Sequence, residues 1–392
     1  MSITVRHPTI RRTAVVLRFA RNDDLTLIAL PWLPLLSGAT VFKGLGTAAF
    51  VLVCAMLLVA YRQRAGRPDT RAGAIAIVAL LLIGLVVTRE ADAQTLVQIV
   101  QLLLIALAIR VGPVLRFTRR ALSVCAASCV LLALAALVDL QTDSSLMFEN
   151  TNGYGVAAMC WSAILVKLLV LPHARVRLFR LCAWLVLPIA LAIVSESRAS
   201  LAAVGAMILW PVLRAGLPGK KLRTLAALLV LALPMIAISL VVSGALTDAQ
   251  DLLPVVGEKT PLSGRDVIWF DIISTLDSDG YRGFGLGSLP GGLLEGHYEG
   301  LSAHNGFLQI LYQCGAVGLA AFLVACALVI VALSRRDDRG IGVAILLGAL
   351  IHEMFEVVLT QNHFGSGLLL WLIVTMAPVA SRHVARLGLH ST

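Results

Sequence analysis

The sequence predicts an all-α, polytopic membrane protein of about 12 transmembrane helices. Two observations support this prediction. The 392 residues are 59% hydrophobic and only 14% charged, with a mean hydropathy of +0.90, which leaves too few charges to cover a soluble domain. Apolar runs of roughly 17–25 residues also recur along the whole chain, and this is the length that a helix needs to cross a bilayer.

Twelve segments have this length and composition. Pro31 and Pro34 interrupt the first segment, and Pro234 lies in the ninth. Such prolines are tolerated where neighbouring helices satisfy the freed carbonyl groups. The predicted spans are residues 24–38, 44–61, 72–88, 93–110, 121–139, 153–171, 179–195, 199–214, 224–246, 303–333, 340–360 and 365–380.

The basic residues predict the orientation of these spans. With a cytoplasmic N-terminus, 25 of the 32 Lys and Arg fall in inner segments and six fall outside, as the positive-inside rule requires. Because they form short clusters between apolar runs, the net charge of +10 does not indicate nucleic-acid binding. The predicted order is an N-terminal cytoplasmic tail (1–23), nine helices (24–246), a large outer loop (247–302), three helices (303–380) and a C-terminal cytoplasmic tail (381–392).

The loop 247–302 is the one outer segment long enough to hold structure. Its residues 264–276 place Val267, Ile268, Phe270, Ile272 and Ile273 on one broad apolar face, which predicts a short helix on the membrane surface. The glycine-rich residues 283–292 predict a flexible turn region. No strand precedes these glycines, so they are not a dinucleotide-binding fingerprint.

Several ionisable residues are predicted to lie at the outer face of the membrane, at positions where a hydrophobic side chain would cost less free energy. A charged side chain at bilayer depth costs roughly 2.5–3.5 kcal/mol, so its presence indicates a function. These candidates are Glu196, Arg198, Arg265, His304, Glu353 and Glu356, and Asn152 and Asn305 occupy two helix mouths on the same side. Their convergence on one side predicts a site there.

The residue types indicate the chemistry. Arg198 occupies a tight junction between two spans and Arg265 begins the predicted surface helix, and two outward arginines near a lipid face suit a pyrophosphate. The imidazole of His304 suits a proton transfer from a hydroxyl group. The structural alternatives are a solvated Arg198 paired with Glu196, an Arg265 neutralised by Asp266, and an interfacial His304 without a chemical role.

The carboxylates and asparagines leave further alternatives open. The motif from His352 to Glu356 is not HExxH, which excludes a zinc-protease site. Glu353 and Glu356 are either partners of Arg198, His304 or Arg265, or hydrogen-bond a sugar. Asn152 is explained equally by turn formation and by substrate contact. Asp277 and Asp279 have the spacing of a metal-binding pair but lie in a turn-like stretch, so no metal site is predicted.

Four short motifs in order resemble one known family. They are Ser197-Arg198, Gly264-Arg265, Gly283-x-Gly285, and His304-Asn305 followed by Gly315 and Gly318. Their order, the twelve spans and the large outer loop are similar to those of the O-antigen ligase and polymerase family. The resemblance runs from about Asn150 to the last span and is most specific over 190–320, whereas the first five spans carry no matching motif.

The resemblance implies a GT-C-like membrane glycosyltransferase of lipopolysaccharide biosynthesis in the bacterial inner membrane. Such an enzyme uses no metal or other cofactor. It transfers a polysaccharide, with inversion, from undecaprenyl pyrophosphate to an acceptor on the periplasmic face. By position, Arg198 and Arg265 correspond to pyrophosphate-binding arginines and His304 to an essential histidine. The expected acceptor is lipid A–core, as in the ligases; the compact loop leaves open a polymerase, whose acceptor is another lipid-linked repeat unit.

Two further classes of function remain as alternatives. A transporter or lipid flippase would show ionisable groups near the bilayer midplane and often inverted repeats. A non-catalytic scaffold would tolerate alanine at Arg198, Arg265 and His304. The expected partners are the lipid-linked glycan donor, the acceptor and membrane lipids.

Overall fold

The computed structural model describes residues 24–38, 75, 77, 93–115, 119–142, 146–148, 150–169, 174–245, 265–290, 302–336, 340–360 and 364–376. Within these ranges every regular element is helical, which confirms the all-α class for this part of the chain. The predicted spans 44–61 and 72–88, apart from Ile75 and Ile77, lie outside the described residues. So do the two predicted tails, 1–23 and 381–392.

Each of the other ten predicted spans contains helix among its described residues. The first is a short helix that continues through η1 (Leu30–Trp32) into α2 (Leu33–Gly38). The remaining elements are α5 (Ala93–Val111), η3 (Gly112–Val114), α6 (Arg119–Gln141), α7 (Thr151–Leu169), α8 (Ala174–Val194), α9 (Arg198–Gly216), α10 (Gly219–Leu229), η4 (Val230–Ala232), α11 (Leu233–Val242), α13 (Arg265–Ser278), α14 (Gly306–Arg336), α15 (Ile341–Glu353) and α16 (Phe364–Thr375).

Four helical segments are long and apolar enough to cross a membrane. They are Arg120–Gln141, Arg198–Gly216, Gly219–Leu240 and Gly306–Arg335. Five shorter apolar helices accompany them among the described residues. This composition is that of a helical membrane protein, while the count of twelve spans stays a prediction.

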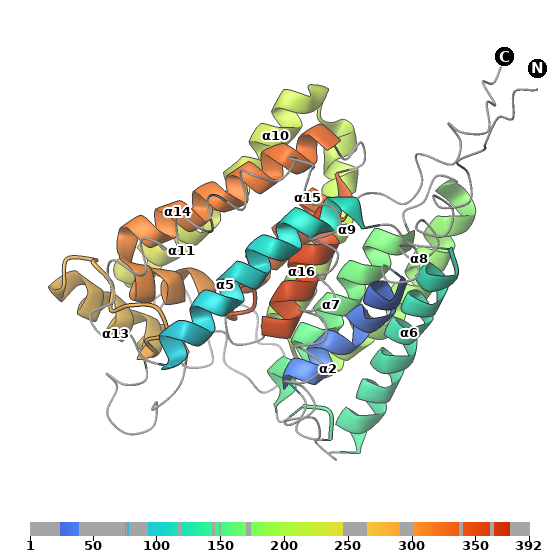
Figure 1. Cartoon of the computed structure of the whole chain (residues 1–392), viewed down its shortest axis with the longest axis horizontal. Helices are drawn as coiled ribbons and strands as arrows, with labels where there is room; N and C mark the ends of the chain where they lie inside the picture. Colours follow the sequence, from blue (N-terminus) through green and yellow to red (C-terminus); the bar gives the residue numbers. More distant parts are fainter. Residues whose placement is uncertain are drawn as a thin grey trace, which may run out of the picture.

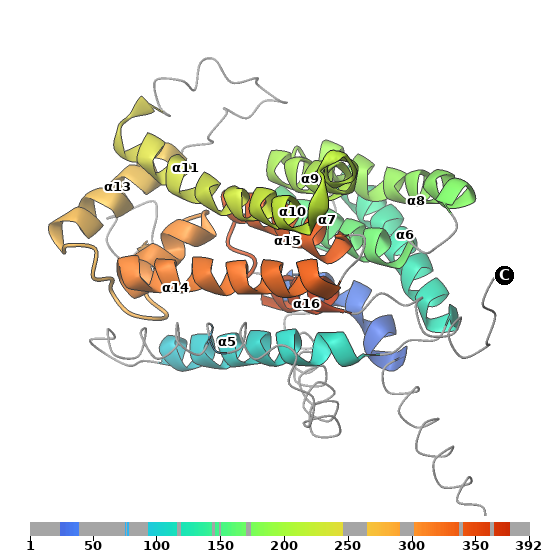
Figure 2. The same ribbon diagram turned by 90° about the horizontal axis from the view of Figure 1, so that it is seen from above.

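The core of the helix bundle is formed by α7, α15 and α16, whose side chains are almost entirely buried. The most extensive packing joins α9 to α15, and α16 also packs against α5, as Figures 1 and 2 show. The surrounding helices instead expose large apolar side chains, such as Leu131 (65% exposed), Val212 (66%), Leu229 (63%) and Val317 (65%). Apolar side chains on this outer surface fit contact with lipid.

Helix α14 is broken at Gly315, whose φ of 67° and ψ of −173° are not helical. The carbonyls of Tyr312 and Gln313 therefore lack helical partners and accept hydrogen bonds from the backbone N–H groups of Phe284 and Gly285, both at 2.8 Å. The N–H of Ala316 donates to Tyr281 at 3.0 Å. The described part of the glycine-rich segment is thus a turn region, as the sequence predicts, and its backbone is paired with this break.

Helix α13 forms where the sequence predicts it, but with a different buried face. Ile268, Ile272 and Ile273 are buried together with Trp269 and Leu276, against α11 and α14. Val267 (49% exposed) and Phe270 (58%) point away from this face. The predicted apolar face is therefore split. Its isoleucines pack α13 against the rest of the protein, and Val267 and Phe270 are exposed on the other side of the helix. Figure 1 shows α13 at one end of the described bundle.

Candidate active site

Two ionisable side chains from different parts of the sequence, Arg265 and His304, meet at Glu356. Its Oε1 accepts a hydrogen bond from Nη2 of Arg265 at 2.6 Å, and its Oε2 lies 3.3 Å from Nδ1 of His304. The side chain of Glu356 is 7% exposed, whereas those of Arg265 and His304 are 19% and 27% exposed. A buried carboxylate thus holds two partly exposed cationic or basic groups side by side.

The end of α15 places Glu356 in this position. The predicted span 340–360 is helical only to Glu353, and the next residues turn back on the helix. The N–H groups of Phe355 and Glu356 both donate to the carbonyl of His352, at 2.9 and 3.1 Å. Because the helix stops here, Glu356 reaches His304 and Arg265 instead of facing a lipid or a neighbouring helix.

His304 lies in a strained turn, and its side chain is partly exposed at the protein surface. Its φ of 46° is one of three positive values for non-glycine residues in the described part. Such a conformation costs of the order of 1–3 kcal/mol and persists only where the surroundings impose it. Here Ala303, directly before it, is held at both backbone groups: its carbonyl accepts from Trp269 Nε1 at 2.8 Å and its N–H donates to Gln309 Oε1 at 3.0 Å.

The neighbouring charges determine which imidazole nitrogen is available for chemistry. An ionised carboxylate only accepts hydrogen bonds, so a bond between Glu356 and His304 requires the proton on Nδ1. In the neutral ring Nε2 then carries the free lone pair. The Arg265 guanidinium favours the ionised form of Glu356. In this arrangement the lone pair on Nε2 of the neutral ring lies on the side of the imidazole away from the carboxylate.

Arg198 begins α9 near the same end of the bundle. Ser200, two residues further on, contacts His352 with 3.2 Å between Oγ and Nε2, and the helix carrying His352 ends at Glu353. Arg198 is half-buried. The structure therefore brings the N-terminus of α9 to the C-terminal end of α15, where the Glu356 cluster begins.

Glu196 occupies the turn that joins α8 to α9. Its φ is 53°, its N–H donates to Ile193 and the N–H of Ser197 donates to Ala192, at 2.9 and 3.0 Å. These two bonds form a Schellman motif, in which glycine normally takes the left-handed position. The motif ends α8 sharply and lets α9 start at Arg198.

The two predicted asparagines have different environments. Asn305 is 3% exposed, and its Oδ1 caps α14 by accepting from the N–H groups of Phe307 and Leu308 at 3.0 and 3.1 Å. Asn152 is a half-buried residue in the first turn of α7. A Cβ added to Gly155, one turn later, would lie 2.2 Å from Ser197 Oγ, so this end of α7 contacts the turn before α9.

Glu353 holds the connection that follows α15. It is fully buried, and its Oε2 accepts from the N–H groups of Val358 and Leu359 at 3.0 and 2.9 Å. A Cβ on Gly306 would lie 1.9 Å from its Oε1, so α14 starts directly against this carboxylate. The sequence did not distinguish the two glutamates, but their roles differ. Glu353 accepts hydrogen bonds from the backbone, and Glu356 binds Arg265 and His304.

This placement predicts different results for two substitutions of Glu353. Glu353→Ala should lower the free energy of unfolding by about 1–3 kcal/mol, because two backbone N–H groups lose their acceptor. Glu353→Gln should stay close to the wild type in stability and activity, because an amide oxygen accepts both bonds. Denaturant unfolding in detergent measures the difference, and a glutamine variant as unstable as the alanine variant would contradict the anchoring role.

Sequence reasoning missed several residues that build this site. They are His352, Ser200, Trp269 and Gly306. The carbonyl of His352 accepts from the N–H of Glu356, and Ser200 contacts the His352 ring. Trp269 holds the carbonyl of Ala303 next to His304, and Gly306 lies directly against Glu353. His352 carries the same signal that selected Glu353, an ionisable side chain inside an apolar run. Ser200, Trp269 and Gly306 carry no signal of their own, since their roles depend on which helices pack together.

Among the described residues, no group of three His, Cys, Asp or Glu is arranged to hold a metal ion. In comparisons with known proteins, no family model and no curated protein matches this sequence.

Proposed function

We propose that this chain is a metal-independent, inverting glycosyltransferase that takes a glycan from a polyprenyl pyrophosphate, as its resemblance to the O-antigen ligase and polymerase family implies. One observation carries the proposal. Glu356 joins the Arg265 guanidinium and the His304 imidazole, so a cation for a pyrophosphate and a base for a hydroxyl group lie in one contact cluster. The partial exposure of both side chains leaves them accessible to substrates.

In the proposed step, Nε2 of His304 takes the proton of the acceptor hydroxyl group. The acceptor oxygen attacks the anomeric carbon of the donor glycan and forms the new glycosidic bond with inversion. The bond from that carbon to the pyrophosphate oxygen breaks, and the leaving group keeps the electron pair. Glu356 stabilises the imidazolium that forms.

The developing charge on the pyrophosphate needs cationic hydrogen-bond donors. A guanidinium carries five N–H donors, and in the described part of the chain the Arg265 side chain bonds to Glu356 alone. Its remaining donors suit two phosphate oxygens in a fork. Arg198 at the start of α9 would supply the second cation. Removing one such preorganised donor typically costs about 10²–10³-fold in turnover.

The acceptor that we propose first is lipid A–core, on the periplasmic face of the inner membrane. A polymerase acting on lipid-linked repeat units would use the same residues and the same donor. The two acceptors give different glycan ladders in cells that lack the protein. Loss of long glycan on lipid A with accumulation of lipid-linked polymer supports ligation, and collapse to single repeat units supports polymerisation.

The mechanism is tested with purified protein and a lipid-linked donor. Arg265→Ala should lower turnover by about 10²-fold or more, whereas Arg282→Ala, which removes an exposed arginine from the same predicted loop, should have little effect. Activity should persist in excess chelator. Normal donor turnover by the Arg265→Ala protein, or unchanged glycans in a null strain, would rule out the proposed enzyme.

A further inference from the structure

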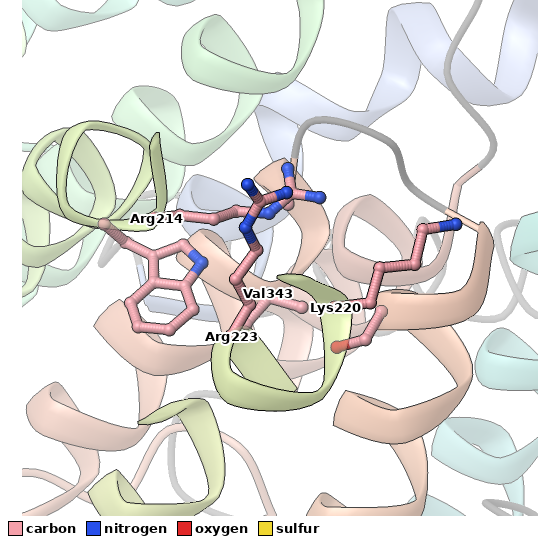
Figure 3. Close-up of a pocket in the computed structure, with 7 residues that line it drawn as sticks. Arg214, Lys220, Arg223 and Val343 are labelled. Carbon is pink, nitrogen blue, oxygen red and sulfur yellow. The ribbon is translucent and has the colours of Figure 1, made fainter. Parts of the chain in front are cut away.

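A small pocket lies at the end of α9 that carries Arg214. Figure 3 shows Arg214, Lys220, Arg223 and Val343 among its lining side chains. Its volume of about 10 Å³ has room for roughly one water molecule. Arg214 already interacts within the chain, and the Nε of Arg223 donates to the carbonyl of Leu217 at 2.9 Å. This pocket therefore offers no space for a substrate or a lipid headgroup.

Buried glutamine side chains lie next to the candidate active site, between α5, α14 and the glycine-rich segment. Gln98 on α5 and Gln309 and Gln313 on α14 are 3%, 0% and 1% exposed. Burying an amide is unfavourable unless it is hydrogen-bonded. Here Nε2 of Gln98 donates to Oε1 of Gln313 at 3.0 Å. Gln309 and Gln313 both donate to the carbonyl of Ser288, at 3.1 and 2.9 Å. The three side chains thus form one hydrogen-bonded cluster.

Gln309 is the member of this cluster that reaches the His304 turn. Its Oε1 accepts from the N–H of Ala303 at 3.0 Å, while its Nε2 donates to Ser288. A backbone N–H only donates and a carbonyl only accepts, so these two partners allow one orientation of the amide. The carbonyl of Ser288 also accepts from Gln313, whereas the N–H of Ala303 donates only to Gln309 within the described part of the chain. Loss of the Gln309 amide therefore acts mainly on Ala303.

Ala303 transmits this contact to His304. The left-handed φ of His304, 46°, persists only where the surroundings impose it. The carbonyl of Ala303 accepts from Trp269 on α13, the helix that begins with Arg265. Together with the bond from Gln309, this fixes the peptide groups on both sides of Ala303. With the N–H released, the turn can relax toward a negative φ and carry the imidazole away from Glu356.

We propose that Gln309 is a positioning residue for His304 and acts through the backbone of Ala303. Because Gln309 is fully buried, it touches no substrate itself. This role rests on the proposed transfer reaction, in which Nε2 of His304 must meet the acceptor hydroxyl group. A displacement of about 1 Å can cost on the order of 10²-fold in rate. Arg265 keeps its own bond to Glu356, so loss of the Gln309 amide lowers turnover and leaves donor binding unchanged.

Gln309→Met is the first test, with purified full-length protein, lipid-linked donor and acceptor. Methionine keeps an unbranched side chain and removes the carboxamide. Turnover should fall by about 10–10²-fold, while the KM for the donor stays near the wild-type value. Gln98→Met is the matched control, since it makes the same change at a buried position of the same cluster that bonds to Gln313 and not to the His304 turn. Equal turnover of the two variants would overturn the proposal.

A double substitution separates positioning from a general loss of stability. If Gln309 acts through the imidazole, Gln309→Met should cause no further loss of turnover in a His304→Ala protein. Substitutions that act independently instead have additive effects on the activation free energy. The same fractional loss in both backgrounds would show that Gln309 supports the fold without positioning His304.

Acylation of histidines by diethyl pyrocarbonate, read by mass spectrometry of the peptides, tests the positioning without the transfer reaction. The side chain of His304 is 27% exposed and should react in the wild type. Gln309→Met should raise its rate several-fold, because the imidazole leaves Glu356, and Gln98→Met should not. An unchanged rate in Gln309→Met would refute the positioning role, whether or not transfer is observed. Full transfer activity of His304→Ala would instead refute the proposed reaction.

Discussion

Glu356→Gln is expected to lower the turnover of the proposed glycosyl transfer by about 10²–10⁴-fold, the range of a general acid–base contribution. The two carboxylate oxygens of Glu356 have different partners, Arg265 on one side and His304 on the other. A glutamine has one accepting oxygen and one amide nitrogen that only donates. Whichever way the amide is turned, either the guanidinium or the imidazole faces a donor.

The loss arises from the protonation state of His304. If the glutamine accepts from Arg265, its NH₂ group faces Nδ1, and that nitrogen must then accept. The proton moves to Nε2, the nitrogen that would take the proton of the acceptor hydroxyl group. If the amide is reversed, its NH₂ group faces the N–H donors of Arg265, and the guanidinium proposed to bind the pyrophosphate shifts. Both outcomes lower turnover, while the fold keeps a side chain of the same size.

The measurement is steady-state transfer with purified protein, lipid-linked donor and acceptor, accompanied by an unfolding curve of each variant. Asp271→Asn is the matched control, since it makes the same chemical change on α13 at a half-exposed position without a role in the cluster. A Glu356→Gln enzyme as active as this control would show that the carboxylate neither orients His304 nor supports Arg265.

The sequence predicts the helices well because the apolar runs that specify them are local signals. The sequence also predicts that Arg198, Arg265, His304 and Glu356 lie at the same end of the helices. This follows from the alternation of basic and non-basic loops along the chain. The pairing of Glu356 with both Arg265 and His304 was one of several open alternatives. It depends on α15 ending at Glu353, and the apolar sequence through Val357, Val358 and Leu359 gives no indication of that end.

The separate roles of Glu353 and Asn305 were also beyond a sequence-based prediction. Both are polar residues at helix ends, and polarity alone does not distinguish a cap from a substrate contact. The difference lies in the acceptors: Asn305 Oδ1 and Glu353 Oε2 are each occupied by two backbone N–H groups. Buried backbone N–H groups require such partners, both at the start of a helix such as α14 and in a connection such as the one after α15. Which side chain supplies them depends on where each helix begins and ends.

The break in α14 was missed for a related reason. Residues 303–333 form one apolar run, so the sequence predicts one continuous span, and Gly315 is a minor interruption in it. The break requires a second segment, Tyr281–Gly285, whose backbone replaces the lost helical bonds. That pairing joins residues about thirty positions apart, and no local pattern predicts it.

Gly315→Ala is expected to lower the free energy of unfolding by about 3 kcal/mol or more. At a φ of 67° and a ψ of −173° the backbone conformation is essentially restricted to glycine, and a side chain there costs about 1–3 kcal/mol. The new Cβ would also lie 2.4 Å from the carbonyl oxygen of Arg282 and 2.6 Å from that of Tyr281. Both atoms belong to the backbone, so overpacking adds about 1–3 kcal/mol.

The substitution should affect the candidate active site as well as stability. The first half of α14 begins with the cap Asn305 and follows directly on His304, so a shift at Gly315 moves the turn that presents the imidazole. Gly205→Ala is the matched control, because a Cβ there would meet nothing within 4 Å in the interior of a helix where alanine is favoured over glycine. Unfolding in detergent and transfer activity are measured for both variants. Equal stability of the two proteins would mean that α14 passes Gly315 as a continuous helix and that the pairing with Tyr281–Gly285 does not hold the site.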